Sequence, residues 1–147
     1  VFIPAIFLYR FIPLPEYTAL FAVGLILVSS LFCFCNLNMK SKDNYFVGFP
    51  AAWNVVVLYF FILDVHPWIT LGVIVLLAGL TLTKMKFLHP FRVRQFMPLN
   101  ILVTFVWMLS SALLILQYPV NQFWLLGLWW LASAYFVGMC LWRSVRG

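Results

Sequence analysis

The most constraining feature of this sequence is a series of long apolar segments without charged residues. One of them, Tyr17–Leu37, runs for 21 residues without a charge, and about 20 apolar residues in a helix cross the hydrocarbon layer of a bilayer. The chain is 66% hydrophobic and only 8% charged, against about 25% charged in soluble proteins. A chain of 147 residues could not bury so much apolar surface in a globular core. The sequence therefore predicts an integral membrane protein.

Turns and two basic connections separate the apolar segments and divide the chain into membrane spans. Continuous apolar runs of this length indicate helices, because the strands of a membrane barrel are shorter and alternate in polarity. We therefore predict an all-α fold, a polytopic transmembrane helical bundle that forms a single domain over 1–147. It has five full spans and a partial N-terminal span. The expected spans are 1–14, 17–37, 46–63, 65–83, 97–118 and 122–142.

The first of these spans is too short to cross a membrane. Fourteen residues of helix reach about 21 Å, which is less than the roughly 30 Å of the hydrocarbon layer. The segment also lacks the basic flank that precedes the apolar region of a signal peptide. We interpret 1–14 as the second half of a spanning helix, and the chain as the C-terminal part of a longer protein.

The third span contains Pro50, which allows two arrangements. Residues 44–49 could form a first helical turn kinked at the proline, or they could lie along the membrane interface with their aromatic side chains at headgroup depth. The ambiguity arises because a helix that starts at Pro50 and ends at Leu63 is short for a span. Of the two arrangements we favour the interfacial one.

Basic residues are distributed unevenly between the two sides that these spans define. The connections 36–44 and 84–94 and the C-terminal residues 143–147 hold eight of the nine Lys and Arg residues, and only Arg10 lies on the opposite side. By the positive-inside rule, this asymmetry places both connections and the C-terminus in the cytoplasm. The net charge of +6 therefore does not indicate a nucleic-acid partner, since no basic run is dense.

No catalytic or metal-binding motif of a soluble enzyme occurs in the chain. The three acids, Glu16, Asp43 and Asp64, fall on two sides of the predicted membrane. They cannot together supply the hard oxygen ligands that Mg²⁺ and Mn²⁺ prefer. The three cysteines lie in apolar segments, which is typical of small buried residues, with a metal or redox pair as the alternative. We expect neither a catalytic residue nor a metal ligand in this chain.

The two basic connections carry the side chains best suited to binding. Residues 38–54 and 84–94 combine cations, aromatic rings and turn formers. This mixture suits a lipid phosphate held by Lys and Arg, or a quaternary ammonium held against aromatic faces. The alternative, which we favour for most single residues, is anchoring at the membrane interface. Asp43 and Asn44 interrupt a cationic connection, which anchoring does not require, and His89 suits either a turn or a phosphate contact.

In these two connections the chain resembles the choline-using bacterial members of the CDP-alcohol phosphatidyltransferase family. The matching stretches are KSKDNYFVGFPAAWNVV at 40–56 and KFLHPFRVR at 86–94. They are specific to the choline-using members, and the resemblance covers essentially the whole chain. The aspartate signature of the family, D-G-x2-A-R-x8-G-x3-D-x3-D, is absent. We expect it upstream of Val1, in agreement with the half-length first span.

The resemblance implies a multi-pass enzyme of the bacterial inner membrane that transfers a phosphatidyl group from CDP-diacylglycerol to choline and releases CMP. It implies Mn²⁺ or Mg²⁺, bound by upstream aspartates, so that this chain alone is expected to be inactive. The expected partners are CDP-diacylglycerol, choline and membrane phospholipid, with a homodimer as a further candidate and no nucleic acid. The alternatives are another CDP-alcohol phosphatidyltransferase, a small polytopic transporter and a non-catalytic membrane scaffold.

The resemblance also suggests roles for side chains in the two connections. Four cations are expected to contact substrate phosphates or anionic lipid: Lys40, Lys42, Arg92 and Arg94. Three aromatic residues are expected to form a choline cage, with Asp43 as the counter-charge: Tyr45, Phe46 and Trp53. Asn44 and His89 complete the predicted substrate-binding residues.

Overall fold

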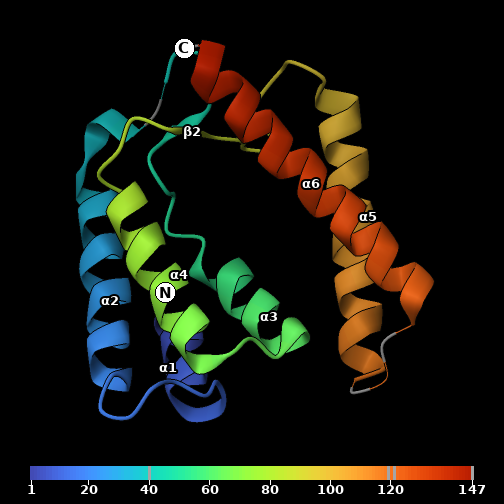
Figure 1. Ribbon diagram of the computed structural model, residues 1–147. Helices are drawn as coiled ribbons and strands as arrows, with labels where there is room; N and C mark the ends of the chain where they lie inside the picture. The colour runs from blue at the N-terminus through green and yellow to red at the C-terminus, as the bar shows by residue number, and fades with distance from the viewer. Residues whose placement is uncertain (40, 119, 121, 147) are drawn as a thin grey trace. The chain divides into compact units, whose positions relative to one another are not determined.

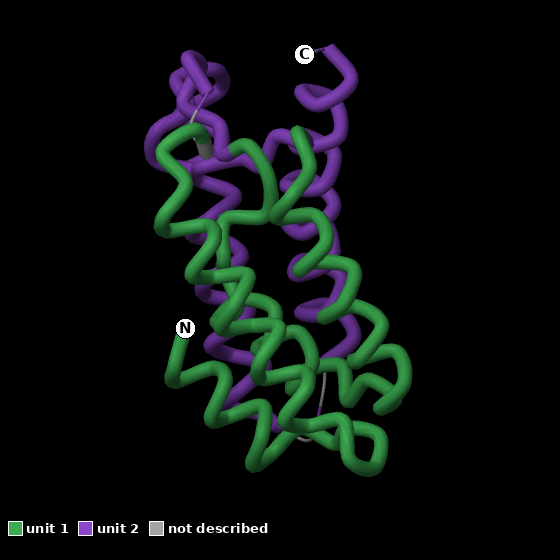
Figure 2. The backbone as a smooth tube through the Cα atoms, turned by 90° about the vertical axis from the view of Figure 1, so that its left-hand side faces the viewer, with its two compact units in different colours: residues 1–39, 47–84 green, residues 40–46, 85–147 purple. Residues whose placement is uncertain are grey.

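The computed structural model describes residues 1–39, 41–118, 120 and 122–146, and most of them are helical (Figure 1). These residues form six α-helices, one 3-10 helix and one two-stranded sheet, which confirms the predicted all-α class. The chain divides into two compact units, shown in different colours in Figure 2. Unit 1 contains residues 1–39 and 47–84, and unit 2 contains residues 40–46 and 85–147. A single transmembrane domain over 1–147 stays a prediction.

Unit 1 consists of four helices and a short 3-10 segment. Their bounds are α1 (Phe2–Phe11), α2 (Ala19–Cys35), η1 (Leu37–Met39), α3 (Trp53–Leu63) and α4 (Pro67–Leu80). Helix α1 packs against α2 and α3, and α2 also packs against α4. Leu8, Ile26 and Ile74 are fully buried, and the Phe7 and Phe61 rings meet edge to face at 5.7 Å.

A turn joins α3 to α4 at the boundary between the predicted spans 46–63 and 65–83. Asp64 ends α3 in the left-handed conformation, with φ at 47°. His66 then caps α4, because its Nδ1 accepts a hydrogen bond from the Trp68 backbone N–H at 3.4 Å. Pro67 occupies the first helical position, where a missing N–H costs little. The turn is therefore specified by residues that are adjacent in the sequence.

Helix α3 begins at Trp53, three residues after Pro50, so residues 46–52 of the predicted third span are not helical. Gly48 and Ala51 have φ angles of 84° and 56°, which a right-handed helix does not accommodate. Pro50 lies between them and lacks a backbone donor. A helical first turn kinked at Pro50 is therefore not observed, while an interfacial position for residues 44–49 stays a prediction.

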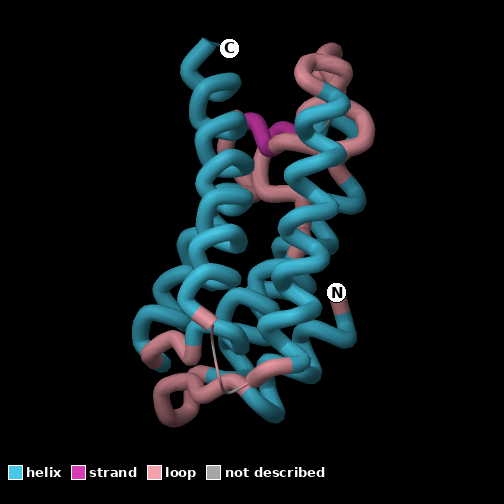
Figure 3. Tube along the Cα trace, turned by 90° about the vertical axis from the view of Figure 1, so that its right-hand side faces the viewer, coloured by secondary structure: helices cyan, strands magenta, loops and turns pink. Residues whose placement is uncertain are grey.

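Unit 2 contains the remaining two helices, the strand β2 (Lys86–Phe87) and the first residue of the strand β1 (Phe46–Val47). Strands β1 and β2 pair with each other. Helix α5 (Met97–Leu116) packs along α6 (Phe123–Arg146), and α6 also contacts β2. Figure 3 shows the helices in cyan and the short strands in magenta, which lie within the pink loops.

Buried polar side chains join α5 to α6. The Trp129 indole N–H donates to the Ser111 hydroxyl at 3.0 Å. The Tyr135 hydroxyl donates to Asn100 Oδ1 at 2.5 Å, and the Asn100 amide donates in turn to the Gln95 carbonyl at 3.0 Å. Asn100 and Trp129 are fully buried. Because a buried polar group must find a partner, these bonds fix the register of the two helices.

Helices α5 and α6 are long and apolar enough to cross a membrane, by length and composition. The other four helices have 10–17 residues. All six lie within the ranges where the sequence predicts apolar spans, apart from the C-terminal extension of α6 to Arg146. Five full spans are not shown by these lengths and stay a prediction.

Candidate functional site

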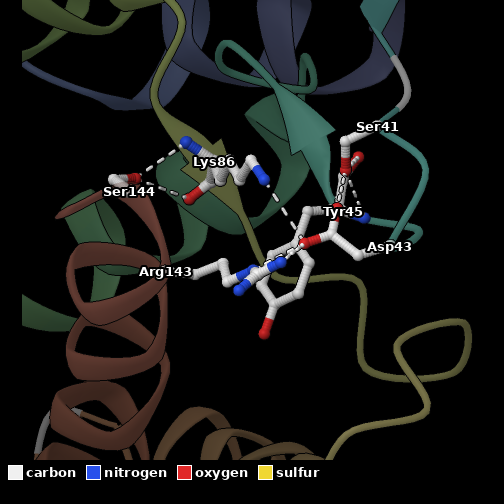
Figure 4. Close-up of polar contacts among 6 residues, drawn as sticks. All are labelled: Ser41, Asp43, Tyr45, Lys86, Arg143 and Ser144. Atoms are coloured by element: carbon white, nitrogen blue, oxygen red, sulfur yellow. Dashed lines mark hydrogen bonds and ion pairs between the residues drawn. The ribbon is translucent and has the colours of Figure 1, made fainter. Parts of the chain in front are cut away.

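The polar centre of unit 2 is the carboxylate of Asp43, which binds two cations (Figure 4). Arg143 donates through Nε and Nη2 to Asp43 Oδ2, each at 2.5 Å. The Lys86 ammonium lies 3.3 Å from the same oxygen, and the Ser41 hydroxyl donates to Oδ1. We call these four residues the Asp43 cluster. It joins the first basic connection to β2 and to the end of α6.

Short-range hydrogen bonds in the first connection place the carboxylate. The Ser41 N–H donates to the Tyr45 carbonyl at 3.0 Å, and the Asn44 N–H donates to the Ser41 carbonyl at 3.1 Å. The Tyr45 N–H donates to the Ser41 hydroxyl at 3.2 Å. Asn44 has a φ of 64°, a conformation that asparagine tolerates better than most residues. The Ser, Asp and Asn of this segment thus specify a tight turn.

The end of α6 holds β2 through both backbone and side-chain contacts. The Lys86 N–H donates to the Ser144 hydroxyl at 2.8 Å, and this hydroxyl donates to the Lys86 carbonyl at 3.3 Å. The Leu88 N–H points to Cys140 Sγ at 3.2 Å. Ser144 and Cys140 lie four positions apart and therefore share one face of the helix. These bonds bring the Lys86 ammonium to the Asp43 carboxylate.

The surroundings of Asp43 favour its charged form. Burial by itself would raise the pKa of this carboxyl, but hydrogen bonds from Ser41, Arg143 and Lys86 outweigh burial and lower the pKa from 3.8 to about 2. With two cations and one anion, the Asp43 cluster carries a net positive charge at neutral pH. In this geometry Asp43 links the first basic connection to Lys86 of β2 and to Arg143 of α6. Neutralisation of choline by Asp43 stays a prediction.

A cavity of about 360 Å³ lies beside the Asp43 cluster within unit 2. Its lining residues come from the two basic connections: Lys42, Asp43, Asn44, Tyr45, Val93, Arg94 and Gln95. Lys42 and Arg94 are exposed, and neither has an acidic partner among the described residues. The predicted candidates Lys42, Asn44 and Arg94 are therefore brought together around one opening.

Tyr45 is 1% exposed, and its hydroxyl has no hydrogen-bond partner among the described residues. Burial raises the pKa of this phenol. The Arg143 guanidinium lies over the Tyr45 ring, 5.9 Å from its centroid, so a cation already contacts this aromatic face. In Figure 4 the hydroxyl points away from Asp43 and Lys86.

The other predicted site residues have different positions. The Phe46 and His89 rings stack at 5.3 Å, and His89 Nδ1 accepts from the Phe91 N–H at 3.3 Å, as a turn histidine does. Arg92 is exposed and does not line the cavity. Trp53 is fully buried at the start of α3 in unit 1, with its indole N–H unpartnered among the described residues. Lys40 lies outside the described residues.

No group of three or more His, Cys, Asp or Glu side chains that could hold a metal occurs in the described part of the chain. The three cysteines are unpaired by disulfides. The carboxylate of Asp43 is already bound by Arg143 and Lys86. The described residues therefore do not fit a divalent metal.

Sequence reasoning missed the residues that complete the Asp43 cluster. The sequence indicates Lys86 and Arg143 only as basic residues near the ends of spans, and it assigns no particular role to Ser41 or Ser144. The position of Asp43 in a cationic connection indicates that it has a cationic partner, because a partly buried carboxylate must be paired. The sequence could not choose the partner, since Lys42 is adjacent whereas Arg143 is 100 residues away.

The fold and the site together define a class of protein: a helical chain with membrane-compatible helices and a cation-rich polar centre at their ends. Among curated proteins, the chain is 74% identical over 146 residues to one named phosphatidylcholine synthase from Pseudomonas aeruginosa, covering 99% of this chain and 61% of that relative. Proteins of the same name from Mesorhizobium japonicum and Agrobacterium fabrum are 34% and 36% identical, over 84% and 73% of this chain. These alignments cover 46% and 44% of the two relatives.

These relationships confirm the resemblance found in the two basic connections: the chain is homologous to bacterial proteins named phosphatidylcholine synthase. It spans about three fifths of the length of the Pseudomonas relative. No family model and no solved structure matches the chain.

Proposed function

We propose that this chain is part of an enzyme that synthesises phosphatidylcholine by transfer of a phosphatidyl group from CDP-diacylglycerol to choline. The observation that carries the proposal is the 74% identity, over nearly the whole chain, to a protein named phosphatidylcholine synthase. The cation-rich cavity beside Asp43 supports it, because a reaction on a lipid diphosphate needs a positively charged surface at headgroup depth.

In the proposed reaction, the hydroxyl oxygen of choline forms a bond to the phosphorus that carries diacylglycerol. The bond from this phosphorus to the CMP oxygen breaks, and CMP leaves with the electron pair. The hydroxyl proton passes to a base that we place outside this chain, since Asp43 is bound by two cations. We propose that carboxylates outside this chain also hold a divalent metal, Mn²⁺ or Mg²⁺, which stabilises charge on phosphate oxygens when bound.

The proposed roles of the side chains follow their chemistry. Four cations would bind substrate phosphates or anionic lipid: Lys40, Lys42, Arg92 and Arg94. Aromatic residues would surround the trimethylammonium group of choline by cation–π contacts: Tyr45, Phe46 and Trp53. Asn44 and His89 would add hydrogen bonds, and Asp43 would supply a negative charge near the choline.

We also propose that the chain contributes five full spans and a partial one to a single domain in the inner membrane. The excess of basic residues in the connections and at the C-terminus supports a cytoplasmic position for these segments. The apolar composition and the lengths of α5 and α6 support the membrane location. A homodimer is part of the same proposal, and oligomeric state in detergent would test it.

The test is an assay of the full-length protein that contains this chain, in bacterial membranes that lack phosphatidylcholine. CDP-diacylglycerol, isotopically labelled choline and Mn²⁺ are supplied together, and we expect labelled phosphatidylcholine and an equal amount of CMP. Serine, inositol and glycerol 3-phosphate serve as competing acceptors. In parallel assays each of these alcohols carries the label instead of choline, and labelled product from one of them but not from choline would support another CDP-alcohol phosphatidyltransferase. The proposal would be contradicted if none of the four acceptors gave CMP. It would also be contradicted if the protein transported choline without forming a lipid product.

A further inference from the structure

The cavity in unit 2 has an uncompensated positive charge. Of its seven lining residues, Lys42 and Arg94 are cations and Asp43 is the only acid. The carboxylate of Asp43 cannot neutralise them as well, because its Oδ2 is already bound by Lys86 and Arg143 and its Oδ1 by Ser41. At neutral pH the charges of Lys42 and Arg94 therefore have no acidic partner among the described residues.

The two walls of the cavity are held by separate sets of backbone hydrogen bonds. On one wall, the turn that begins at Ser41 fixes residues 42–45. On the other, the Val93 N–H donates to the His89 carbonyl at 3.1 Å, and the Met97 N–H donates to the Arg94 carbonyl at 3.3 Å. Val93 is 1% exposed and anchors this second wall. The cations are thus carried by backbone that is ordered without a ligand, which lowers the entropic cost of binding.

The position of the cavity indicates which anion would fill it. Arg94 lies three residues before α5, a helix long and apolar enough to cross a membrane. A side chain at the end of such a helix lies at headgroup depth, where lipid phosphates are concentrated. A guanidinium binds phosphate oxygens through two parallel N–H donors, and an ammonium adds a point charge. The amides of Asn44 and Gln95 supply uncharged donors.

We propose that this cavity binds the phosphate of a membrane lipid between Lys42 and Arg94. This inference rests on the membrane position in the proposed function, and it does not require transferase activity. Two lipids carry the required chemistry: an anionic phospholipid such as phosphatidylglycerol, and the nucleotide lipid CDP-diacylglycerol. The site differs from the wider set of candidate cations, since Arg92 lies outside it.

The experiment measures lipid binding to the full-length protein by native mass spectrometry in detergent. The probes are phosphatidylglycerol, CDP-diacylglycerol and, as a zwitterionic reference, phosphatidylcholine. Loss of two charged contacts in the double variant Lys42→Gln with Arg94→Gln is expected to weaken binding of at least one anionic lipid about tenfold. The matched control is Lys84→Gln, which removes an exposed cation outside the cavity and should leave binding unchanged.

The two anionic probes identify the source of the phosphate. Weaker binding of phosphatidylglycerol alone assigns the site to an anionic phospholipid, and weaker binding of CDP-diacylglycerol alone assigns it to the nucleotide lipid. The inference would be overturned if the double variant bound each anionic lipid as tightly as the unmodified protein does. It would also be overturned if Lys84→Gln weakened lipid binding as much as the double variant does. If the double Gln variant does not fold, two other sets of variants test the site. The charge-conserving double variant Lys42→Arg with Arg94→Lys should keep its lipid affinity. Each single variant, Lys42→Gln or Arg94→Gln, should lose lipid affinity about threefold.

Failure of this inference can be distinguished from failure of the proposed function. The binding measurement needs neither choline nor a metal. If the protein binds lipid phosphate but makes no phosphatidylcholine, only the transferase assignment is contradicted. If the protein makes phosphatidylcholine and the double variant binds lipid as tightly as the unmodified protein, only the proposed binding site is contradicted.

Discussion

The guanidinium of Arg143, in the last turns of α6, donates from two nitrogens to a single carboxylate oxygen of Asp43, 100 residues earlier in the chain. Lys86 approaches the same oxygen from β2. One carboxylate thus connects three separate segments of unit 2. A short turn can hold its position against the end of a long helix in this way, because charge-assisted hydrogen bonds are stronger than neutral ones.

Substitution Asp43→Asn should destabilise the protein. The amide keeps the size of the side chain, but it removes the charge between Lys86 and Arg143 and leaves two partly buried cations near each other. We expect a loss of about 1–2 kcal/mol, since the pair is partly screened by solvent. The measurement is thermal unfolding of the full-length protein in detergent. Asp64→Asn is the control, because Asp64 is exposed and its left-handed backbone suits asparagine. Equal losses in the two variants would argue against a stabilising role for the cluster.

Acid should weaken the same contact over a defined range of pH. The pKa of Asp43 is lowered to about 2 in the folded protein from 3.8, so the unfolded chain binds the proton more tightly. Stability from this group is therefore fully present above about pH 4 and is lost as the pH falls through 2. The difference in unfolding temperature between the unmodified protein and Asp43→Asn should shrink from pH 5 to pH 2. A difference that is constant over this range would contradict the assigned protonation.

Removal of the Tyr135 hydroxyl should loosen the contact between α5 and α6. Tyr135→Phe keeps the ring but leaves buried Asn100 Oδ1 without this donor. The expected cost is about 1–2 kcal/mol, because an acceptor deprived of its partner keeps its desolvation penalty. Chemical unfolding in mixed micelles would measure it. Tyr9→Phe, at an exposed tyrosine in α1, should cost little. A Tyr135 variant as stable as the Tyr9 variant would show that the buried bond contributes nothing.

Kinetics with both substrates would test the proposed choline cage. In the full-length enzyme, Tyr45→Ala and Trp53→Ala should each raise the KM for choline about five- to tenfold, and that for CDP-diacylglycerol far less, because only choline carries a cation for an aromatic face. Tyr45→Phe keeps the ring and removes a hydroxyl without a described partner, so it should retain the choline KM. Parallel changes for both substrates would leave Tyr45 and Trp53 with a structural role alone.

Helices and turns with strong local signals were predictable from the sequence. The apolar runs indicate all six helices, and Asp64, His66 and Pro67 form the turn between the predicted spans 46–63 and 65–83. Helix α3 begins at Trp53, later than the Pro50 start that the favoured interfacial arrangement implies and seven residues after the start of the predicted span at 46. Apolar composition continues through residues 46–52, but the backbone at Gly48 and Ala51 is left-handed. Hydropathy responds to side chains and does not register such backbone conformations.

The site was only partly predictable. Composition pointed to both basic connections, and the structure brings Lys42, Asn44 and Arg94 around one cavity. It did not predict that Phe46 stacks on His89, or that Arg143 lies over Tyr45. These contacts join residues that are distant in sequence. Their choice depends on packing that no local pattern encodes.

The sequence by itself determined the helical class, the apolar character of the helices and the clustering of cations in two connections, because these properties depend on the kind and spacing of side chains along the chain. Only the tertiary structure decided which cations neutralise Asp43 and which remain free to bind an anion. Lys42 is its sequence neighbour, yet Lys86 and Arg143 are its partners. The physical reason is that an ion pair depends on distance in space, and the packing of α6 against β2 sets that distance.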